Sequence, residues 1–321
     1  MLHVACCTDR RFAPDCAVML ASLTATNPAV TVHFLHDQSL ARGDLEILET
    51  IVTSAGGAFD VIEVPAEDAV ELTRSERFPV QVWYRVLLPE LLPELPRVLY
   101  LDADTLITGP LAPLWETDLD GCLVGAVTNP LLASMLPRIQ RDLGLPDLGS
   151  YFNSGVLLID LAAWRAGATA EAVLDFVRAH PSVIWPDQDA LNAVLHARRL
   201  HLHPRWNAMP GLWNVSQRYL PHSPGEVREA VRDPAVVHFV GPHKPWHYRS
   251  RHPYRAQYFA YLDSTPWRGR PIEGRTPWQV VLRPLPWLWS YHIEVAADRL
   301  QTQLRSVRHR LARLPRARRQ S

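Results

Sequence analysis

The sequence predicts an α/β fold with a mainly parallel, mixed sheet, and two features carry this prediction. Through the first 130 residues, short apolar runs alternate with longer segments of helical spacing. Such alternation is typical of strands joined by right-handed helical crossovers, which cover both faces of a sheet. Further apolar runs at 155–159 and 235–240 add late strands. No G-x-G-x-x-G follows the first run, so we expect a Rossmann-like core without the dinucleotide fingerprint.

The expected elements follow one another along the chain. Each expected strand is a short apolar run, and each expected helix has apolar residues recurring at three and four positions. A proline near the start of 14–26 favours a helix there, and two glycines at 56 and 57 precede the third strand. The expected strands are 3–7, 31–36, 60–64, 97–101, 123–127, 155–159 and 235–240. The expected helices are 14–26, 40–54, 81–92, 170–178 and 188–196.

The composition is that of a globular protein, with 47% hydrophobic and 21% charged residues among 321. Basic and acidic residues number 33 each, so the net charge indicates no nucleic-acid partner. The four cysteines lack metal-ligand spacing and suit a reducing compartment. No signal-peptide pattern opens the chain, and no apolar run reaches the roughly 18 residues of a membrane span. We therefore expect a cytoplasmic protein.

A boundary is expected near residue 264, where the composition changes to Pro, Trp and Arg (T-P-W-R-G-R-P, R-P-L-P-W-L-W). Residues 1–264 are predicted to form the main domain and 265–321 a C-terminal segment. Within that segment, apolar residues recur every three to four positions with arginines between them: Leu300, Leu304, Val307, Leu311 and Leu314. Such a basic amphipathic helix can lie on an anionic membrane surface, with Trp287, Trp289 and Tyr291 at the headgroup level. A solvated tail, or a helix packed on the main domain, is the alternative.

The stretch V-L-Y-L-D-A-D-T, residues 98–105, ends an apolar run on two acids, Asp102 and Asp104, separated by Ala103. On extended backbone, residues two apart project to the same side, and this strand end lies at the edge where α/β sheets bind ligands. Two neighbouring carboxylates repel each other unless a cation lies between them, and their oxygens suit Mg²⁺ or Mn²⁺. Solvated or turn-capping acids are the alternative.

The stretch V-V-H-F-V-G-P-H-K-P-W-H, residues 236–247, places His238 in a late strand and Lys244 after a glycine turn. Lys244 is the single lysine of the chain, and all other fixed positive charges are arginines. A lone lysine indicates a site that needs a compact ammonium, such as a phosphate contact. A packed core histidine and neutral drift of the lysine are the alternatives.

Two more stretches carry polar side chains next to apolar elements. Y-F-N-S-G-V-L-L-I-D contains Asn153 at the start of a buried strand, and W-P-D-Q-D-A-L-N opens a helix with Asp187, Gln188 and Asp189. Acids at a helix N-terminus are favourable through capping and the dipole alone. Three adjacent hydrogen-bonding side chains also suit a site for sugar hydroxyls, and both interpretations remain open.

These four stretches, in this order and spacing, resemble the retaining glycosyltransferases of family 8, and within it the lipooligosaccharide α-1,4-galactosyltransferase type of bacteria. The resemblance covers essentially the whole chain. It implies a nucleotide-diphospho-sugar transferase fold of the GT-A type, with residues 1–264 as the catalytic domain. It also implies Mn²⁺-dependent transfer of galactose or glucose from a UDP-sugar to a glycan or lipid-linked acceptor, such as a lipopolysaccharide core. The acceptor fits a peripheral location on the inner face of the cell membrane.

The resemblance further implies the residues of the donor site. Asp102, Asp104 and His238 would hold Mn²⁺, with Mg²⁺ possible, and Ala103 would line the same site. Lys244 and the Gly241 backbone would contact the diphosphate. The remaining donor contacts are Thr8 and Asp9 toward uracil and ribose, Arg85 toward the donor, and Asn153, Asp187 and Gln188 around the sugar.

Three of these positions, Asn153, Gln188 and Asp189, are the candidate catalytic residues. Gln188 would lie behind the anomeric carbon, and Asp189 occupies a position sometimes considered as a nucleophile. Because an amide is a poor nucleophile, we expect front-face transfer rather than double displacement. Residues 75–84 are expected to act as a lid. Asn129 stands where the galactosyltransferase type carries an aspartate, which leaves galactose, glucose and N-acetylglucosamine open as donor sugars.

Two other functions remain as alternatives. A metal-dependent sugar-phosphate nucleotidyltransferase would also use paired acids and a lysine, but such enzymes usually have a glycine-rich phosphate loop near the N-terminus, which this chain lacks. A non-catalytic sugar-nucleotide-binding protein would keep the binding residues without turnover.

Overall fold

The computed structural model describes residues 1–65, 80–131, 133–180, 185–242 and 244–283. The chain divides into two compact units. Met1–Trp246 and Ser250–Pro271 form the first, and His247–Arg249 with the described residues from Ile272 onward belong to the second. The predicted amphipathic helix at 300–314, its aromatic residues at 287–291, and residues 75–79 of the predicted lid lie outside the described residues.

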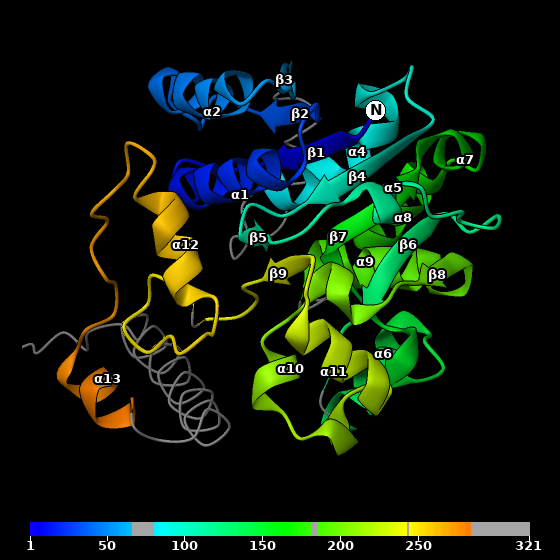
Figure 1. Ribbon diagram of the computed structural model, residues 1–321. Coiled ribbons are helices and arrows are strands. Elements are labelled where there is room, and N and C mark those ends of the chain that lie inside the picture. Colours follow the sequence, from blue (N-terminus) through cyan, green and yellow to red (C-terminus); the bar gives the residue numbers. More distant parts are fainter. Residues whose placement is uncertain (66–79, 132, 181–184, 243, 284–321) are drawn as a thin grey trace, which may run out of the picture. The chain divides into compact units, whose positions relative to one another are not determined.

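A seven-stranded sheet in the order β3-β2-β1-β4-β7-β6-β8 forms the centre of the first unit (Figure 1). Its strands are β1 His3–Cys7, β2 Thr31–His36, β3 Ala58–Glu63, β4 Arg97–Leu101, β6 Val124–Thr128, β7 Phe152–Asp160 and β8 Arg199–His201. The pairs β1–β2, β2–β3, β1–β4 and β6–β8 are parallel, whereas β7 is antiparallel to both of its neighbours. The predicted mainly parallel, mixed sheet is thereby confirmed.

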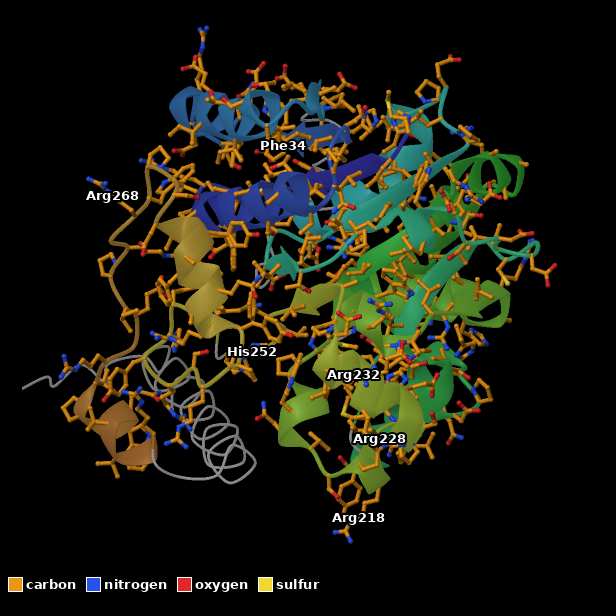
Figure 2. The ribbon with its side chains drawn as sticks, viewed as in Figure 1. Phe34, Arg218, Arg228, Arg232, His252 and Arg268 are labelled. Carbon is orange, nitrogen blue, oxygen red and sulfur yellow. The ribbon has the colours of Figure 1, made fainter. Side chains whose placement is uncertain are left out.

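Helices cover both faces of this sheet, as the sequence predicts (Figure 1). Alternate strand residues point to opposite faces. Cys6, Phe34 and Leu99 pack with α1 and α2 on one face, where Phe34 lies below α2 (Figure 2). Cys7 and Leu35 pack on the other face with α4, α7, α8 and α9. The helices are α1 Ala13–Thr26, α2 Arg42–Ser54, α4 Tyr84–Leu91, α5 Ala112–Trp115, α6 Leu136–Leu143, α7 Leu161–Ala166, α8 Thr169–Ala179, α9 Pro186–Leu195, α10 Gly211–Asn214, α11 Pro224–Arg232 and α12 Arg255–Leu262.

A second, two-stranded sheet joins β5 Thr105–Ile107 to β9 Val236–His238. The strands are antiparallel, and Thr105 is opposite His238. The predicted strand at 235–240 is therefore present, but it is shorter and lies outside the large sheet. This pairing brings the segment after β4 next to a segment more than 130 residues later in the chain.

The direction of β7 places its first residues at the carboxyl edge of the parallel strands. Leu101, the last residue of β4, is opposite Val156, and the Asp102 amide donates to the Gly155 carbonyl at 2.8 Å. Since β7 runs antiparallel, its N-terminal residues meet the segment that follows β4. Asn153 is thereby brought to the same edge as the two predicted acids.

The second unit contains α13, Pro277–Leu282. The Tyr248 amide donates to the Glu273 carbonyl at 2.8 Å, and the Arg283 guanidinium lies 4.6 Å from the centre of the Tyr248 ring. Trp278 and Val281 are 54% and 62% exposed. Within the described residues, no helix has both the length and the apolar character needed to cross a bilayer.

Candidate functional site

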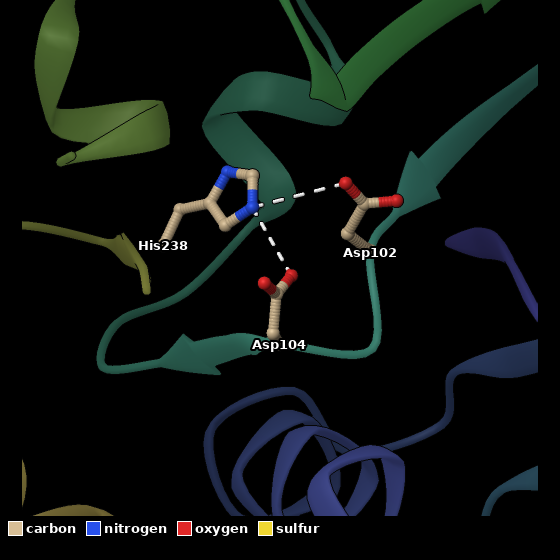
Figure 3. A group of neighbouring side chains, drawn as sticks. All are labelled: Asp102, Asp104 and His238. Atoms are coloured by element: carbon tan, nitrogen blue, oxygen red, sulfur yellow. Dashed lines mark hydrogen bonds and ion pairs between the residues drawn. The ribbon is translucent and has the colours of Figure 1, made fainter. Parts of the chain in front are cut away.

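Asp102, Asp104 and His238 converge at the carboxyl edge of the sheet (Figure 3). Nε2 of His238 lies 3.1 Å from Oδ1 of Asp104 and 3.7 Å from Oδ2 of Asp102. One ligand atom from each residue lies within 4.8 Å of the other two. Two carboxylate oxygens and an imidazole nitrogen form a donor set that fits a divalent cation. The predicted metal ligands are thus close together, although both acids lie in the turn between β4 and β5 and His238 lies on β9.

Gly155 has no side chain, and the space that a Cβ atom would fill there is where these three side chains meet. A Cβ atom at this position would stand 2.2 Å from Cε1 of His238 and 2.5 Å from Oδ2 of Asp102. Real Cβ atoms essentially never come within 3.0 Å of another heavy atom. Any other residue at 155 would therefore displace His238 or Asp102. Sequence reasoning assigned no role to Gly155, because a glycine in a strand gives no signal of what lies above it.

Arg85 and Tyr100 fix the orientation of Asp102. Nη2 of Arg85 donates to Oδ1 of Asp102 at 2.9 Å, and the Tyr100 hydroxyl donates to the same oxygen at 3.1 Å. The Arg85 guanidinium also stacks 4.5 Å from the centre of the Tyr100 ring. Because Oδ1 accepts both bonds, Oδ2 is the oxygen that faces His238. Arg85, predicted as a donor-binding residue, is 4% exposed, and in this structure it contacts the Asp102 carboxylate.

Lys244 lies against Asp104. Its ammonium donates to Oδ2 of Asp104 and, at 2.5 Å, to the Phe239 carbonyl. Burial alone would raise the pKa of Asp104, but Lys244 and His238 outweigh it and hold that pKa far below its ordinary value. Gly241 has a positive φ of 89°, which allows the turn that brings Lys244 back toward the acids. The predicted lysine is thus adjacent to the predicted metal ligands.

Asn153 and Gln188 are joined directly. Nδ2 of Asn153 donates to Oε1 of Gln188 at 3.0 Å, and the Ser154 amide donates to the same oxygen at 3.1 Å. Asp187 accepts from the Ser154 hydroxyl at 3.2 Å and lies 3.5 Å from Arg85. Burial raises the pKa of Asp187, and the charge of Arg85 only partly offsets this. The start of α9 therefore connects to both the arginine and β7.

Asp189 points away from this group. Its side chain is fully buried, forms an ion pair with Arg138, and accepts from the Tyr151 hydroxyl at 2.7 Å. It also accepts from the Trp185 amide at 3.1 Å. These contacts with Arg138, Tyr151 and the Trp185 amide hold the start of α9 in place.

Thr8 and Asp9 follow β1 at the same edge of the sheet. Thr8 is buried, and its hydroxyl donates to the Asp9 carbonyl at 3.2 Å. Oδ1 of Asp9 accepts from the Phe12 amide at 2.9 Å, which fixes the turn before α1. Ala103 is half-buried between the two acids. Among the described residues, no hydrogen bond or ion pair links Thr8 or Asp9 to Asp102, Asp104 or His238.

Asp37 is a residue of this edge that sequence reasoning missed. It follows β2 and accepts from the Tyr84 hydroxyl at 2.6 Å and from Nε2 of Gln81 at 2.9 Å. Burial opposes its ionisation, but these bonds and those from Ser39 hold its pKa below the ordinary value. Asp37 thus fixes residues 80–84, the described part of the predicted lid. The sequence signal that could have identified Asp37 is an acid directly after a predicted strand.

Comparison with known proteins identifies relatives along most of the chain. The profile of glycosyl transferase family 8 matches residues 3–250. General stress protein A of Bacillus subtilis (strain 168) is 31% identical over 278 residues, which are 83% of this chain and 95% of that protein. Lipopolysaccharide glucosyltransferase WaaO of Escherichia coli (strain K12) is 23% identical over 275 residues, covering 83% and 79% of the two chains.

A solved structure shows the same architecture. The crystal structure of galactosyltransferase LgtC, in complex with donor and acceptor sugar analogs, has a TM-score of 0.71 and 26% sequence identity. The likeness covers 83% of this chain and 96% of that chain. The predicted GT-A-type fold and the predicted resemblance are both confirmed.

Proposed function

The chain belongs to glycosyltransferase family 8, and we propose that it transfers a hexose, galactose or glucose, from a UDP-sugar to a glycan or lipid-linked acceptor such as a lipopolysaccharide core. One observation carries this proposal: two carboxylates and an imidazole converge beside Lys244 and Arg85 at the ligand-binding edge of the sheet. Lipopolysaccharide glycosyltransferases among the relatives support the acceptor class.

Asp102, Asp104 and His238 would hold Mn²⁺, and the imidazole nitrogen favours Mn²⁺ over Mg²⁺, which prefers oxygen ligands. When bound, this cation would offset the negative charge that develops on UDP as the glycosidic bond breaks. Lys244 would add an ammonium to the same diphosphate, and the exposed Gly241 turn would let backbone approach it. Thr8 and Asp9 remain the proposed contacts of uracil and ribose.

The donor sugar would be lined by Asn153, Asp187 and Gln188. Oε1 of Gln188 already accepts two hydrogen bonds, so this oxygen is a poor candidate for attack on the anomeric carbon. Asp189 is fully buried and ion-paired, which argues against it as a nucleophile. We therefore favour front-face transfer. The acceptor hydroxyl forms the new bond to the anomeric carbon, the bond to the phosphate oxygen breaks, and that oxygen takes the hydroxyl proton. A sugar adduct trapped on Asp189 would contradict this mechanism.

The C-terminal segment is the proposed membrane contact, with the protein cytoplasmic and peripheral on the inner face of the cell membrane. In its described part, Trp278 and Val281 are exposed apolar side chains on α13, and arginines precede and follow that helix. Exposed tryptophan next to arginine suits the interface of an anionic bilayer. Sedimentation with anionic and with zwitterionic vesicles tests this proposal, since binding to both or to neither would contradict it.

The deciding experiment is UDP release from UDP-galactose, UDP-glucose and UDP-N-acetylglucosamine, with Mn²⁺ and with a chelator. Release from one hexose donor that requires the metal is the expected result. Nucleotide binding without release, also in the presence of lipopolysaccharide core acceptors, would instead favour a non-catalytic sugar-nucleotide-binding protein. Pyrophosphate-dependent formation of UTP would favour the nucleotidyltransferase.

A further inference from the structure

A chain of hydrogen bonds runs behind the three metal-ligand candidates, and two backbone amides fix its direction. The Gly155 amide donates to Oδ1 of Asn153 at 3.0 Å, and the Ser154 amide donates to Oε1 of Gln188 at 3.1 Å. A backbone N–H can only donate, so the side-chain atoms facing these amides must be oxygens. The orientations of the Asn153 and Gln188 amide groups are thereby determined, with Nδ2 of Asn153 donating to Gln188.

Asn207 extends this chain to His238. It ends the 3₁₀ turn Pro204–Asn207, is fully buried, and donates from Nδ2 to Oδ1 of Asn153 at 2.9 Å. Its Oδ1 must then be the atom that lies 3.0 Å from Nδ1 of His238. An amide oxygen accepts, so Nδ1 of His238 carries the hydrogen. Nε2 is left as the nitrogen that faces Asp104 and Asp102 (Figure 3).

We propose that Asn207 is a positioning residue, which holds His238 with its Nε2 directed at the cation site and couples that histidine to Gln188. The proposal rests on the proposed metal-dependent function. A histidine that binds a metal through one nitrogen is generally held by a hydrogen bond from the other, which fixes its tautomer and ring orientation. Here the partner is a side-chain amide whose own direction is set by the Gly155 backbone.

The other end of the chain reaches the start of α9. Nε2 of Gln188 donates to the Tyr151 hydroxyl at 2.9 Å, and that hydroxyl donates to Asp189. Both lone pairs of Gln188 Oε1 are used, so the group that Gln188 can offer to a bound sugar is its second amide hydrogen. Asp189 thereby acts on Gln188 through Tyr151, as a positioning residue rather than a reacting group.

Two substitutions of Asn207 separate its two contacts. In Asn207→Asp, a carboxylate oxygen still accepts from Nδ1 of His238, but no hydrogen remains for Oδ1 of Asn153. In Asn207→Leu, which has similar volume, both contacts are lost. Asn27→Leu is the matched control, because Asn27 is also a buried asparagine whose side-chain oxygen accepts a hydrogen bond, here from the Leu111 amide at 2.6 Å, but it directly follows α1.

The test is Mn²⁺ binding by the full chain without nucleotide sugar, measured from the electron paramagnetic resonance signal of free Mn²⁺. Asn207→Leu is expected to bind Mn²⁺ about 10- to 100-fold more weakly than the wild type, the usual cost of losing such a partner. Asn207→Asp is expected to keep its Mn²⁺ affinity while its rate of UDP release falls. Asn27→Leu is expected to lose thermal stability but no Mn²⁺ affinity.

Two results would overturn the inference. Asn207→Leu could fold and bind Mn²⁺ as the wild type does, so that the contact with His238 has no effect. Asn207→Asp, which keeps both the side-chain volume and the hydrogen bond accepted from His238, could lose tenfold or more in Mn²⁺ affinity, so that this accepted bond is not what holds the site. This second result decides the matter even if Asn207→Leu does not fold. Failure of the wild type itself to bind Mn²⁺ would instead contradict the proposed function on which the inference rests.

Discussion

Replacing Gly155 with alanine is expected to weaken cation binding strongly in a chain that still folds. The added Cβ would stand 2.2 Å from Cε1 of His238, so the ring must withdraw by about 0.8 Å to reach the 3.0 Å limit for such contacts. Strand β7 cannot yield instead, because it is paired to β4 on one side and to β6 on the other. Oδ2 of Asp102, at 2.5 Å, would be pushed in the same way.

Overpacking of this kind costs about 1–3 kcal/mol of folding free energy. A misplacement approaching 1 Å within a site can lower turnover about 100-fold. Gly155→Ala should therefore show a moderate fall in melting temperature, a large loss of Mn²⁺ affinity, and at least about 100-fold slower UDP release from the preferred donor.

Gly125→Ala is the matched control. Gly125 lies in the neighbouring strand β6, and a Cβ there would meet only the ends of leucine side chains at 3.2 to 3.4 Å. It should lose some stability and keep its Mn²⁺ affinity. Gly155→Ala with wild-type Mn²⁺ affinity and wild-type turnover would refute the assignment of this space to a cation.

Three further predictions follow from the same geometry. Asp104→Ala should lower UDP release on the order of 1,000-fold, about 4 kcal/mol of transition-state stabilisation, and UDP release that stays at the wild-type rate in this variant would contradict the role assigned to this carboxylate. Asp189→Asn should retain turnover per folded molecule within about tenfold, whereas loss of a nucleophile costs 10⁴-fold or more, so rate measurements on the folded fraction decide between the two roles. Burial, with His33 and the amino terminus, lowers the pKa of His3, so the folded chain binds fewer protons than the unfolded chain below about pH 6.5. The urea midpoint should fall between pH 7.5 and 5.5, and an equal fall in His3→Gln would contradict this origin.

Sequence reasoning predicted most successfully those features whose pattern lies within a single short stretch of the chain. The apolar run of β4 and the spacing of Asp102 and Asp104 indicated both the strand and the direction of the two acids. The single lysine drew attention to Lys244, which the structure places against Asp104. In each case the signal is local, because side chains two apart on a strand, or a rare residue type, can be recognised without knowing what packs nearby.

The parts that sequence reasoning missed depend on contacts between distant segments. β5 and β8 have three residues each, too short for a periodic pattern to show. Asn207 lies in an irregular turn with no motif, and only the register of β9 brings it to His238. Gln188 and Asp189 are adjacent, and successive helix residues differ by about 100° in direction. Which of the two faces the site is decided by Tyr151 and Arg138, and no local pattern contains that information.

The end of the first unit can be located by truncation, because a buried ion pair crosses the predicted boundary at residue 264. Asp15 of α1 is fully buried, accepts from Arg270 at 3.0 Å through both oxygens, and also accepts from the Tyr258 hydroxyl at 2.5 Å. A chain ending at 264 loses Arg270 and leaves this carboxylate buried without its cation. Breaking a buried pair from one side costs about 3–5 kcal/mol.

A chain ending at 276 keeps Arg270 and loses α13 with everything after it. We expect it to fold, to release UDP at the wild-type rate, and no longer to bind anionic vesicles. The chain ending at 264 should instead unfold at a much lower urea concentration. Arg270→Met in the full-length chain is the matched control and should reproduce most of the stability loss without loss of vesicle binding. If the chain ending at 264 is as stable in urea as the one ending at 276, the ion pair between Asp15 and Arg270 does not stabilise the first unit. If the chain ending at 276 still binds anionic vesicles, the membrane contact lies before residue 277 and the proposed role of the C-terminal segment is wrong.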